Sequence, residues 1–228
     1  MASRILHLAV AAKIKEQMYV ADGNRFQLGM ILPDAYNGQA SKTDSHLKIW
    51  ICGGTKKTYD LERFRHEFHT LLYQEQDTLY LGYYLHLIQD LIFRRLMYED
   101  YHWNPVPDGN VLRLHNDYHL INRHVIDKYG LKQNIKLPEN FQKEKIYSLY
   151  PFDVMRLLDD LQHDFAESCD GEIFFFTKSL ADEFIIKATD VCVKEMAALR
   201  DGNFCMMPMN GLGRVYNKRY VTMRKMRV

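Results

Sequence analysis

The sequence has few cysteines and no long hydrophobic run. Its 4 cysteines are widely spaced and form no Cys-x-x-Cys pair. This spacing argues against a disulfide framework and against a cysteine-based zinc knuckle, which need cysteines at short, paired intervals. No stretch approaches the roughly 18 consecutive apolar residues that a membrane-spanning helix needs. We therefore expect free thiols and no transmembrane segment.

A charge excess of either sign is also missing. The chain has 30 lysines and arginines against 29 aspartates and glutamates, a net charge of +1. Such a balance gives no general attraction to nucleic acid, so binding to it would need a local basic patch. The basic segment 214–227 is one candidate, although segments of this kind are more often solvated tails. Nucleic acid is thus a possible partner that the sequence does not favour.

The start of the chain has no signal-peptide pattern, because its short apolar run is interrupted at Lys13 and Lys15. We therefore expect a cytoplasmic protein. Its 228 residues, 47% hydrophobic and 26% charged, are typical of one globular domain that spans the whole chain.

The hydrophobic pattern is mainly helical. Apolar residues recur at helical spacing in the segments 7–20, 60–74, 77–98, 111–129, 151–168 and 179–200. The segment 77–98 is apolar nearly all round, which predicts a buried central helix. The remaining stretches are a short apolar piece at 25–32, polar connections at 37–44, 101–110 and 132–150, and a possible strand at 171–176. The sequence therefore predicts an all-α, multi-helix bundle.

His86 and Asp90 lie in the predicted central helix and face the same way, because they are four residues apart. A buried carboxylate costs free energy unless it is paired or bound to a metal. On spacing alone the pair is either a metal site or a His–Asp hydrogen bond inside a helical core. Arg94 and Arg95, further along the helix, could face a phosphate or form structural ion pairs.

Further candidate ligands lie before and after this pair in the sequence. They are His7 on the apolar side of the first helix, Asp34 at a turn after proline, His46, and the pair His115 and His119 at helical spacing. A lone histidine on an apolar face is more often a core residue than a ligand. Zinc, however, binds histidine nitrogen and aspartate oxygen, and hydrolytic sites often hold two or more ions. The candidates therefore predict a metal site within residues 1–125.

The same residues resemble a known family. His7, the stretch 26–34 that ends in Pro-Asp, Ser45-His46 and the His-x-x-x-Asp motif at 86–90 follow the order found in the zinc-dependent phospholipase C family. That family is all-helical and is related to the single-strand-specific zinc nucleases. The resemblance covers roughly the first 120 residues. We expect the segment 151–228, which lies beyond it, to complete the bundle or cover the site.

The resemblance implies a role for each matching residue. Asp34, His46, His86 and Asp90 would bind one zinc ion, and Asp90 would bridge to a second zinc ion that His7 also binds. Asp34 would also be the base that orients the attacking water.

The match departs from the family at the third zinc ion, whose ligands there are two histidines and an acidic residue. His115 and His119 occupy the expected place, but His119 stands where the acidic residue is expected. Asp117 or His102 are the alternatives for this site. We therefore expect one or two ions rather than three.

These implications predict a zinc-dependent phosphodiesterase in which a metal-bound hydroxide attacks the phosphoester. The substrate would be a phospholipid head group or a small phosphodiester. Asp117 or Asn116 would orient the ligating histidines. The alternative is a helical metal-binding or interaction protein that has no catalytic activity.

Overall fold

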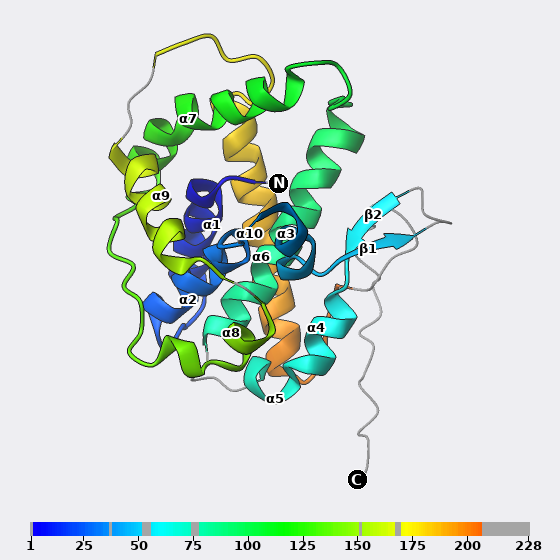
Figure 1. Cartoon of the computed structure of the whole chain (residues 1–228), viewed down its shortest axis with the longest axis vertical. Coiled ribbons are helices and arrows are strands. Elements are labelled where there is room, and N and C mark those ends of the chain that lie inside the picture. The colour runs from blue at the N-terminus through cyan, green and yellow to red at the C-terminus, as the bar shows by residue number, and fades with distance from the viewer. Residues whose placement is uncertain are drawn as a thin grey trace.

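A computed structural model describes residues 2–36, 38–51, 56–73, 78–150, 152–166 and 170–206. These residues form ten α-helices, shorter 3-10 and π-helical turns, and one two-stranded antiparallel sheet (Figure 1). The fold is therefore mainly helical, as the all-α prediction requires. No helix within the described ranges has the length and apolar character to span a membrane.

The elements follow one another along the chain with short connections. The α-helices are α1 (Arg4–Gln17), α2 (Gly23–Ile31), α3 (Gly38–Ser45), α4 (Leu61–Glu67), α5 (His69–Leu72), α6 (Thr78–Arg94), α7 (Asn110–Lys128), α8 (Lys145–Leu149), α9 (Val154–Ala166) and α10 (Lys178–Arg200). The shorter turns are η1 (Leu32–Asp34), η2 (Arg95–Asp100) and η3 (Phe141–Lys143). The strands are β1 (Lys48–Ile51) and β2 (Lys56–Tyr59).

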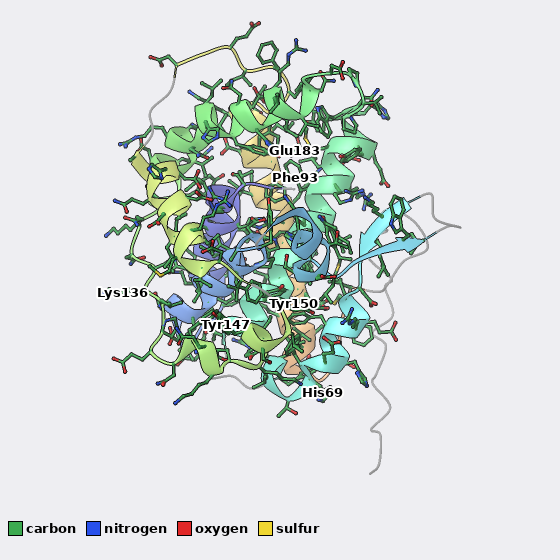
Figure 2. All side chains as sticks on the ribbon, in the orientation of Figure 1. His69, Phe93, Lys136, Tyr147, Tyr150 and Glu183 are labelled. Atoms are coloured by element: carbon green, nitrogen blue, oxygen red, sulfur yellow. The ribbon has the colours of Figure 1, made fainter. Side chains whose placement is uncertain are left out.

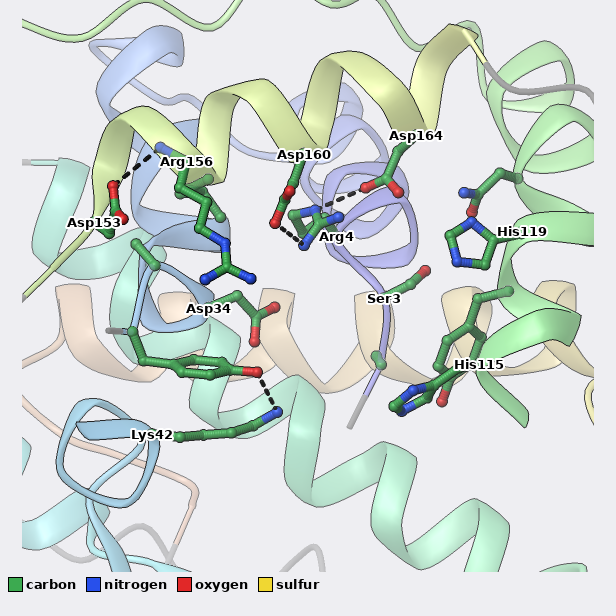
Figure 3. Close-up of a pocket in the computed structure, with 16 residues that line it drawn as sticks. Ser3, Arg4, Asp34, Lys42, His115, His119, Asp153, Arg156, Asp160 and Asp164 are labelled. Carbon is green, nitrogen blue, oxygen red and sulfur yellow. Dashed lines mark hydrogen bonds and ion pairs between the residues drawn. The ribbon is translucent and has the colours of Figure 1, made fainter. Parts of the chain in front are cut away.

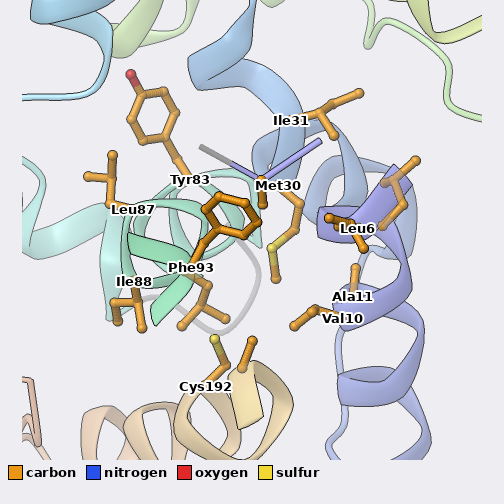
Figure 4. Packing of buried hydrophobic residues seen from close by; sticks show 14 of the residues in the cluster. Leu6, Val10, Ala11, Met30, Ile31, Tyr83, Leu87, Ile88, Phe93 and Cys192 are labelled. Carbon is orange, nitrogen blue, oxygen red and sulfur yellow. The ribbon is translucent and has the colours of Figure 1, made fainter. Parts of the chain in front are cut away.

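Helix α6 is the centre of the hydrophobic core. All its residues are buried except Leu81 and Arg94, which confirms the prediction of a central helix. Helices α2 and α10 pack along it, and α1 packs against both of them. Figure 4 shows side chains of the four helices meeting around Met30 and Phe93. Each fully buried apolar side chain of this kind contributes about 1.5–3 kcal/mol to folding.

Two glycines let α2 and α6 pack against each other at backbone distance. A Cβ atom on Gly29 would overlap the carbonyl oxygen of Leu79, and one on Gly82 would overlap that of Phe26. Glycine is therefore required at both positions for steric reasons. The close approach fixes the end of α2, and with it Asp34 in the following turn η1, relative to α6.

We expect Gly82→Ala to lower the free energy of unfolding by about 2–3 kcal/mol, because the added methyl group forces α2 away from α6. Chemical denaturation measures this change. Gly23→Ala is the matched control, since the nearest atoms to a Cβ there are in the Lys15 side chain at 3.9 Å. The control should be at least as stable as the wild type. Equal stability of the two variants would contradict the packing argument.

The structure corrects several predictions of local structure. The polar stretch 37–44, predicted as a loop, mostly belongs to α3, and the hairpin β1–β2 was not predicted. The predicted helix 60–74 is divided into α4 and α5. The polar stretch 132–150 contains η3 and α8, although its first part runs over the surface with Lys136 exposed at the edge of the molecule (Figure 2). Helix α3, the hairpin, η3 and α8 have little apolar periodicity, so their sequences alone do not reveal them.

The predicted strand at 171–176 is not a strand. The backbone N–H groups of Phe174, Phe175 and Phe176 instead donate to the Asp117 carboxylate, at 2.9, 2.7 and 2.9 Å. The aromatic run that favoured a strand serves packing instead, since Phe176 is fully buried against Phe93. Side-chain capping of these amides replaces the hydrogen bonds of a sheet.

Candidate metal centre

Five of the predicted ligands converge at one place in the core. His7 comes from α1, Asp34 from η1, His46 from the turn after α3, and His86 and Asp90 from α6. Two overlapping groups, His7–Asp34–His86 and His46–His86–Asp90, each bring their ligand atoms within 4.8 Å of one another. The structure therefore assembles the cluster that the sequence predicted from segments far apart in the chain.

The distances within the cluster are those of atoms grouped around a common point. The Nε2 atom of His46 lies 3.4 Å from an Asp34 oxygen and 3.4 Å from Nε2 of His86. Both Nε2 atoms lie 3.8 Å from the same Asp90 oxygen, and His7 Nε2 lies 3.7 Å from the other. Ligand atoms around a tetrahedral zinc ion are about 3.3 Å apart, given zinc–nitrogen bonds of about 2.0 Å. The cluster thus needs only small movements to hold zinc.

Each histidine of the cluster is oriented by a hydrogen bond at its Nδ1 atom. His86 Nδ1 lies 2.7 Å from the Met30 carbonyl oxygen, and His46 Nδ1 lies 3.0 Å from that of Lys42. His7 Nδ1 lies 2.9 Å from the Gln89 side-chain oxygen. Because these oxygens only accept hydrogen bonds, each Nδ1 carries the proton and each neutral ring keeps a lone pair on Nε2. The three lone pairs are directed into the cluster.

The charges of the cluster also favour a cation. Burial lowers the pKa of all three imidazoles, that of His7 to about 4, so the rings are neutral at pH 7. Burial opposes ionisation of Asp34 and Asp90, but the pKa of both carboxyls is lowered, because a neighbouring imidazole that takes up a proton stabilises the carboxylate. The buried carboxylates therefore favour a positive charge among the rings, which either a proton on an imidazole or a metal ion can supply.

Local contacts hold Asp34 and His46 in place. Pro33 lies in the first turn of η1, and its carbonyl oxygen accepts a hydrogen bond from the Ser45 hydroxyl at 2.9 Å. This bond ties the end of α3 to the turn that carries Asp34. Leu47 then adopts a left-handed backbone with φ of 49°, which leads the chain from α3 into β1. His46 and Asp34 are thereby kept side by side.

Sequence reasoning missed three groups that contact the cluster. Gln89 holds His7, while the Tyr59 hydroxyl and the backbone N–H of Ala2 donate to Asp90 at 3.3 and 3.1 Å. Gln89 could have been predicted, because a polar amide in an otherwise apolar helix needs a hydrogen-bond partner. Nothing in the sequence pointed to the other two, because only the tertiary fold brings them to α6.

The remaining predicted ligands lie outside the cluster. His115 and His119 are exposed on α7, and neither joins an ion-binding group of the described residues. His102 is exposed in the loop after η2. The prediction that Asp117 orients a ligating histidine is wrong, because its carboxylate accepts three backbone N–H groups of another segment. Asn116 is exposed and orients none of the three clustered histidines.

A cavity of about 280 Å³ opens beside the cluster, and Asp34 is the only one of its five residues that lines it. Figure 3 shows His115 and His119 on the opposite side of this cavity from Asp153 and Arg156. Its wall also contains an ion pair between Arg4 and Asp164 at 2.7 Å. The cavity gives a small molecule access to Asp34 at the edge of the buried centre.

Comparisons of the chain with protein-family models, with curated proteins and with solved structures found no match. The fold and the cluster therefore define the class of site by geometry alone: a buried group of three histidines and two aspartates in a helical protein, next to an open cavity.

We expect Gln89→Met to raise the zinc dissociation constant about 10- to 100-fold, because His7 loses the group that orients its ring. Competition with a chelating dye measures the constant. Tyr84→Phe is the control: it removes a buried hydroxyl from the same helix, where Tyr84 donates to Glu195 at 2.7 Å and lies outside the cluster. If both variants weaken zinc binding equally, Gln89 has no specific role.

Proposed function

We propose that this protein is a zinc-dependent hydrolase of phosphoester bonds, similar to the zinc-dependent phospholipases C. The observation that carries the proposal is the convergence of three imidazole nitrogens and two carboxylates beside a cavity. The order of these residues along the chain, from His7 to Asp90, is the order of the family that the sequence resembles.

The donor set fits zinc. His46, His86 and Asp90 would hold one ion, and His7, Asp34 and His86 form a second, overlapping group. This arrangement supports one or two ions. Zinc bound here would supply a Lewis acid and lower the pKa of a coordinated water to about 7.

Asp34 is the residue suited to act on the reacting water. Its side chain is 11% exposed and lines the cavity, whereas those of His46 and Asp90 are completely buried. The neighbouring His46 lowers the pKa of the Asp34 carboxyl against the effect of burial. The carboxylate is therefore ionised at neutral pH and can accept a hydrogen bond that orients a water molecule bound at the centre.

The cavity supports a small substrate. Its volume of about 280 Å³ suits a head group or a small phosphodiester rather than duplex nucleic acid. Lys42 and Arg156 line it and can bind phosphate oxygens, and Asp153 and Asp160 place acidic groups on the same wall. Because the lining carries both signs of charge, it suits a small phosphodiester that also carries hydroxyl groups.

We expect Asp34→Asn to lower kcat about 10²- to 10⁴-fold, because the neutral amide binds the metal ion and orients the water less well than the carboxylate. Hydrolysis of a chromogenic phosphodiester by the zinc-loaded protein measures the loss. Asp159→Asn is the matched control, since Asp159 is exposed on α9 and does not line the cavity. Full activity of purified Asp34→Asn would show that the assigned role is wrong.

A zinc-binding protein without catalysis is the second candidate. It is favoured by the position of His115 and His119, which leaves the ligands of a third ion unassembled within the described part of the chain. A panel of phosphodiesters and phosphomonoesters, tested with and without chelator, separates the two functions. Chelator-sensitive turnover supports the hydrolase, and its absence from zinc-loaded protein supports the binding protein.

A further inference from the structure

A second cavity, of about 250 Å³, lies between α3, the hairpin β1–β2 and the end of α6. Four of the side chains that line it are cationic: Lys42, Lys48, Lys57 and Arg94. No carboxylate of a described residue lines it. We call this cavity, with its four cations, the basic pocket.

The cations of the basic pocket have no acidic partners among the described residues. Lys42 Nζ lies 3.0 Å from the Tyr36 hydroxyl, and Lys57 Nζ lies 4.4 Å from the centre of the Trp50 ring. The Nε atom of Arg94 is buried and has no hydrogen-bond partner. Four cations around one cavity repel one another, and a buried N–H without a partner costs free energy. Both effects are relieved by an anion that accepts hydrogen bonds.

The basic pocket is adjacent to the candidate metal centre. Tyr59 forms part of its wall and also donates to an Asp90 oxygen at 3.3 Å. Lys42 lines both the basic pocket and the cavity beside Asp34. The Lys42 side chain therefore borders both cavities, so an anion in the basic pocket lies next to a molecule bound in the cavity beside Asp34.

We propose that the basic pocket binds a second phosphate group of the substrate while the phosphoester to be cleaved lies at the metal centre. This inference rests on the proposed hydrolase function. Phosphate suits the pocket because a guanidinium binds two of its oxygens at once and ammonium groups add further charge-assisted hydrogen bonds. The preferred substrates are then small molecules with two phosphates rather than one.

A matched pair of substrates tests the proposal. They are the 4-nitrophenyl ester of thymidine 5′-phosphate with and without a phosphate at the 3′ position, hydrolysed by the zinc-loaded protein. The variants are Arg94→Gln and, in case that one folds poorly, Lys48→Gln. Arg95→Gln is the control, because the neighbouring Arg95 lies 3.8 Å from Glu99 and lines a different cavity.

The second phosphate should raise kcat/KM at least about tenfold in the wild type and in Arg95→Gln. The advantage should fall below about twofold in Arg94→Gln and Lys48→Gln. Because the ratio compares two substrates of one variant, general losses of activity cancel. An equal kcat/KM for the two substrates in the active wild type overturns the inference and leaves the proposed hydrolase intact. The inference is also overturned if Arg94→Gln and Lys48→Gln keep the kcat/KM advantage of the substrate with the second phosphate.

Calorimetric titration with inorganic phosphate separates the remaining cases. If no substrate is hydrolysed but Arg94→Gln and Lys48→Gln weaken phosphate binding while Arg95→Gln does not, the proposed function fails and the basic pocket remains a phosphate site. If phosphate binding depends on Arg94 while the substrate's second phosphate gives no advantage, the pocket binds free phosphate, and the inference is overturned.

Discussion

Two carboxylates buried among neutral imidazoles are the constraint around which this fold is arranged. Asp34 and Asp90 stay ionised although burial opposes it, and the three histidines that surround them direct unprotonated Nε2 atoms to the same place. A core that concentrates negative charge and nitrogen lone pairs favours a cation at its centre. We therefore expect metal binding to stabilise the folded structure.

The scaffold supplies this centre mainly through backbone contacts. Helix α2 lies against α6 at Gly29 and Gly82, so the turn that carries Asp34 is fixed relative to His86 and Asp90. Backbone carbonyl oxygens orient two of the three histidine rings. The same framework leaves Asp34 at the edge of a cavity, so one residue of the buried cluster is accessible from it.

The centre could be predicted from the sequence where a polar residue interrupts a strong apolar pattern. His86 and Asp90 stand out in a helix that is otherwise apolar, and that helix is the centre of the core. His115 and His119 have the same spacing but lie on an exposed face of α7. Helical spacing therefore predicted a ligand of the cluster only where the surrounding residues are apolar. Helix α3 and the hairpin have little apolar periodicity, and tertiary contacts such as that between Ser45 and Pro33 hold them.

The most direct test of the account is the zinc content of the purified protein, measured by elemental analysis beside two histidine variants. Wild type and His69→Ala, whose histidine is exposed on α5, should each hold one or two zinc ions per chain. His86→Ala should lose most of this zinc, because His86 belongs to both ligand groups. A wild type that holds no zinc and cannot be reloaded, or a His86→Ala variant with full zinc content, would contradict the metal centre.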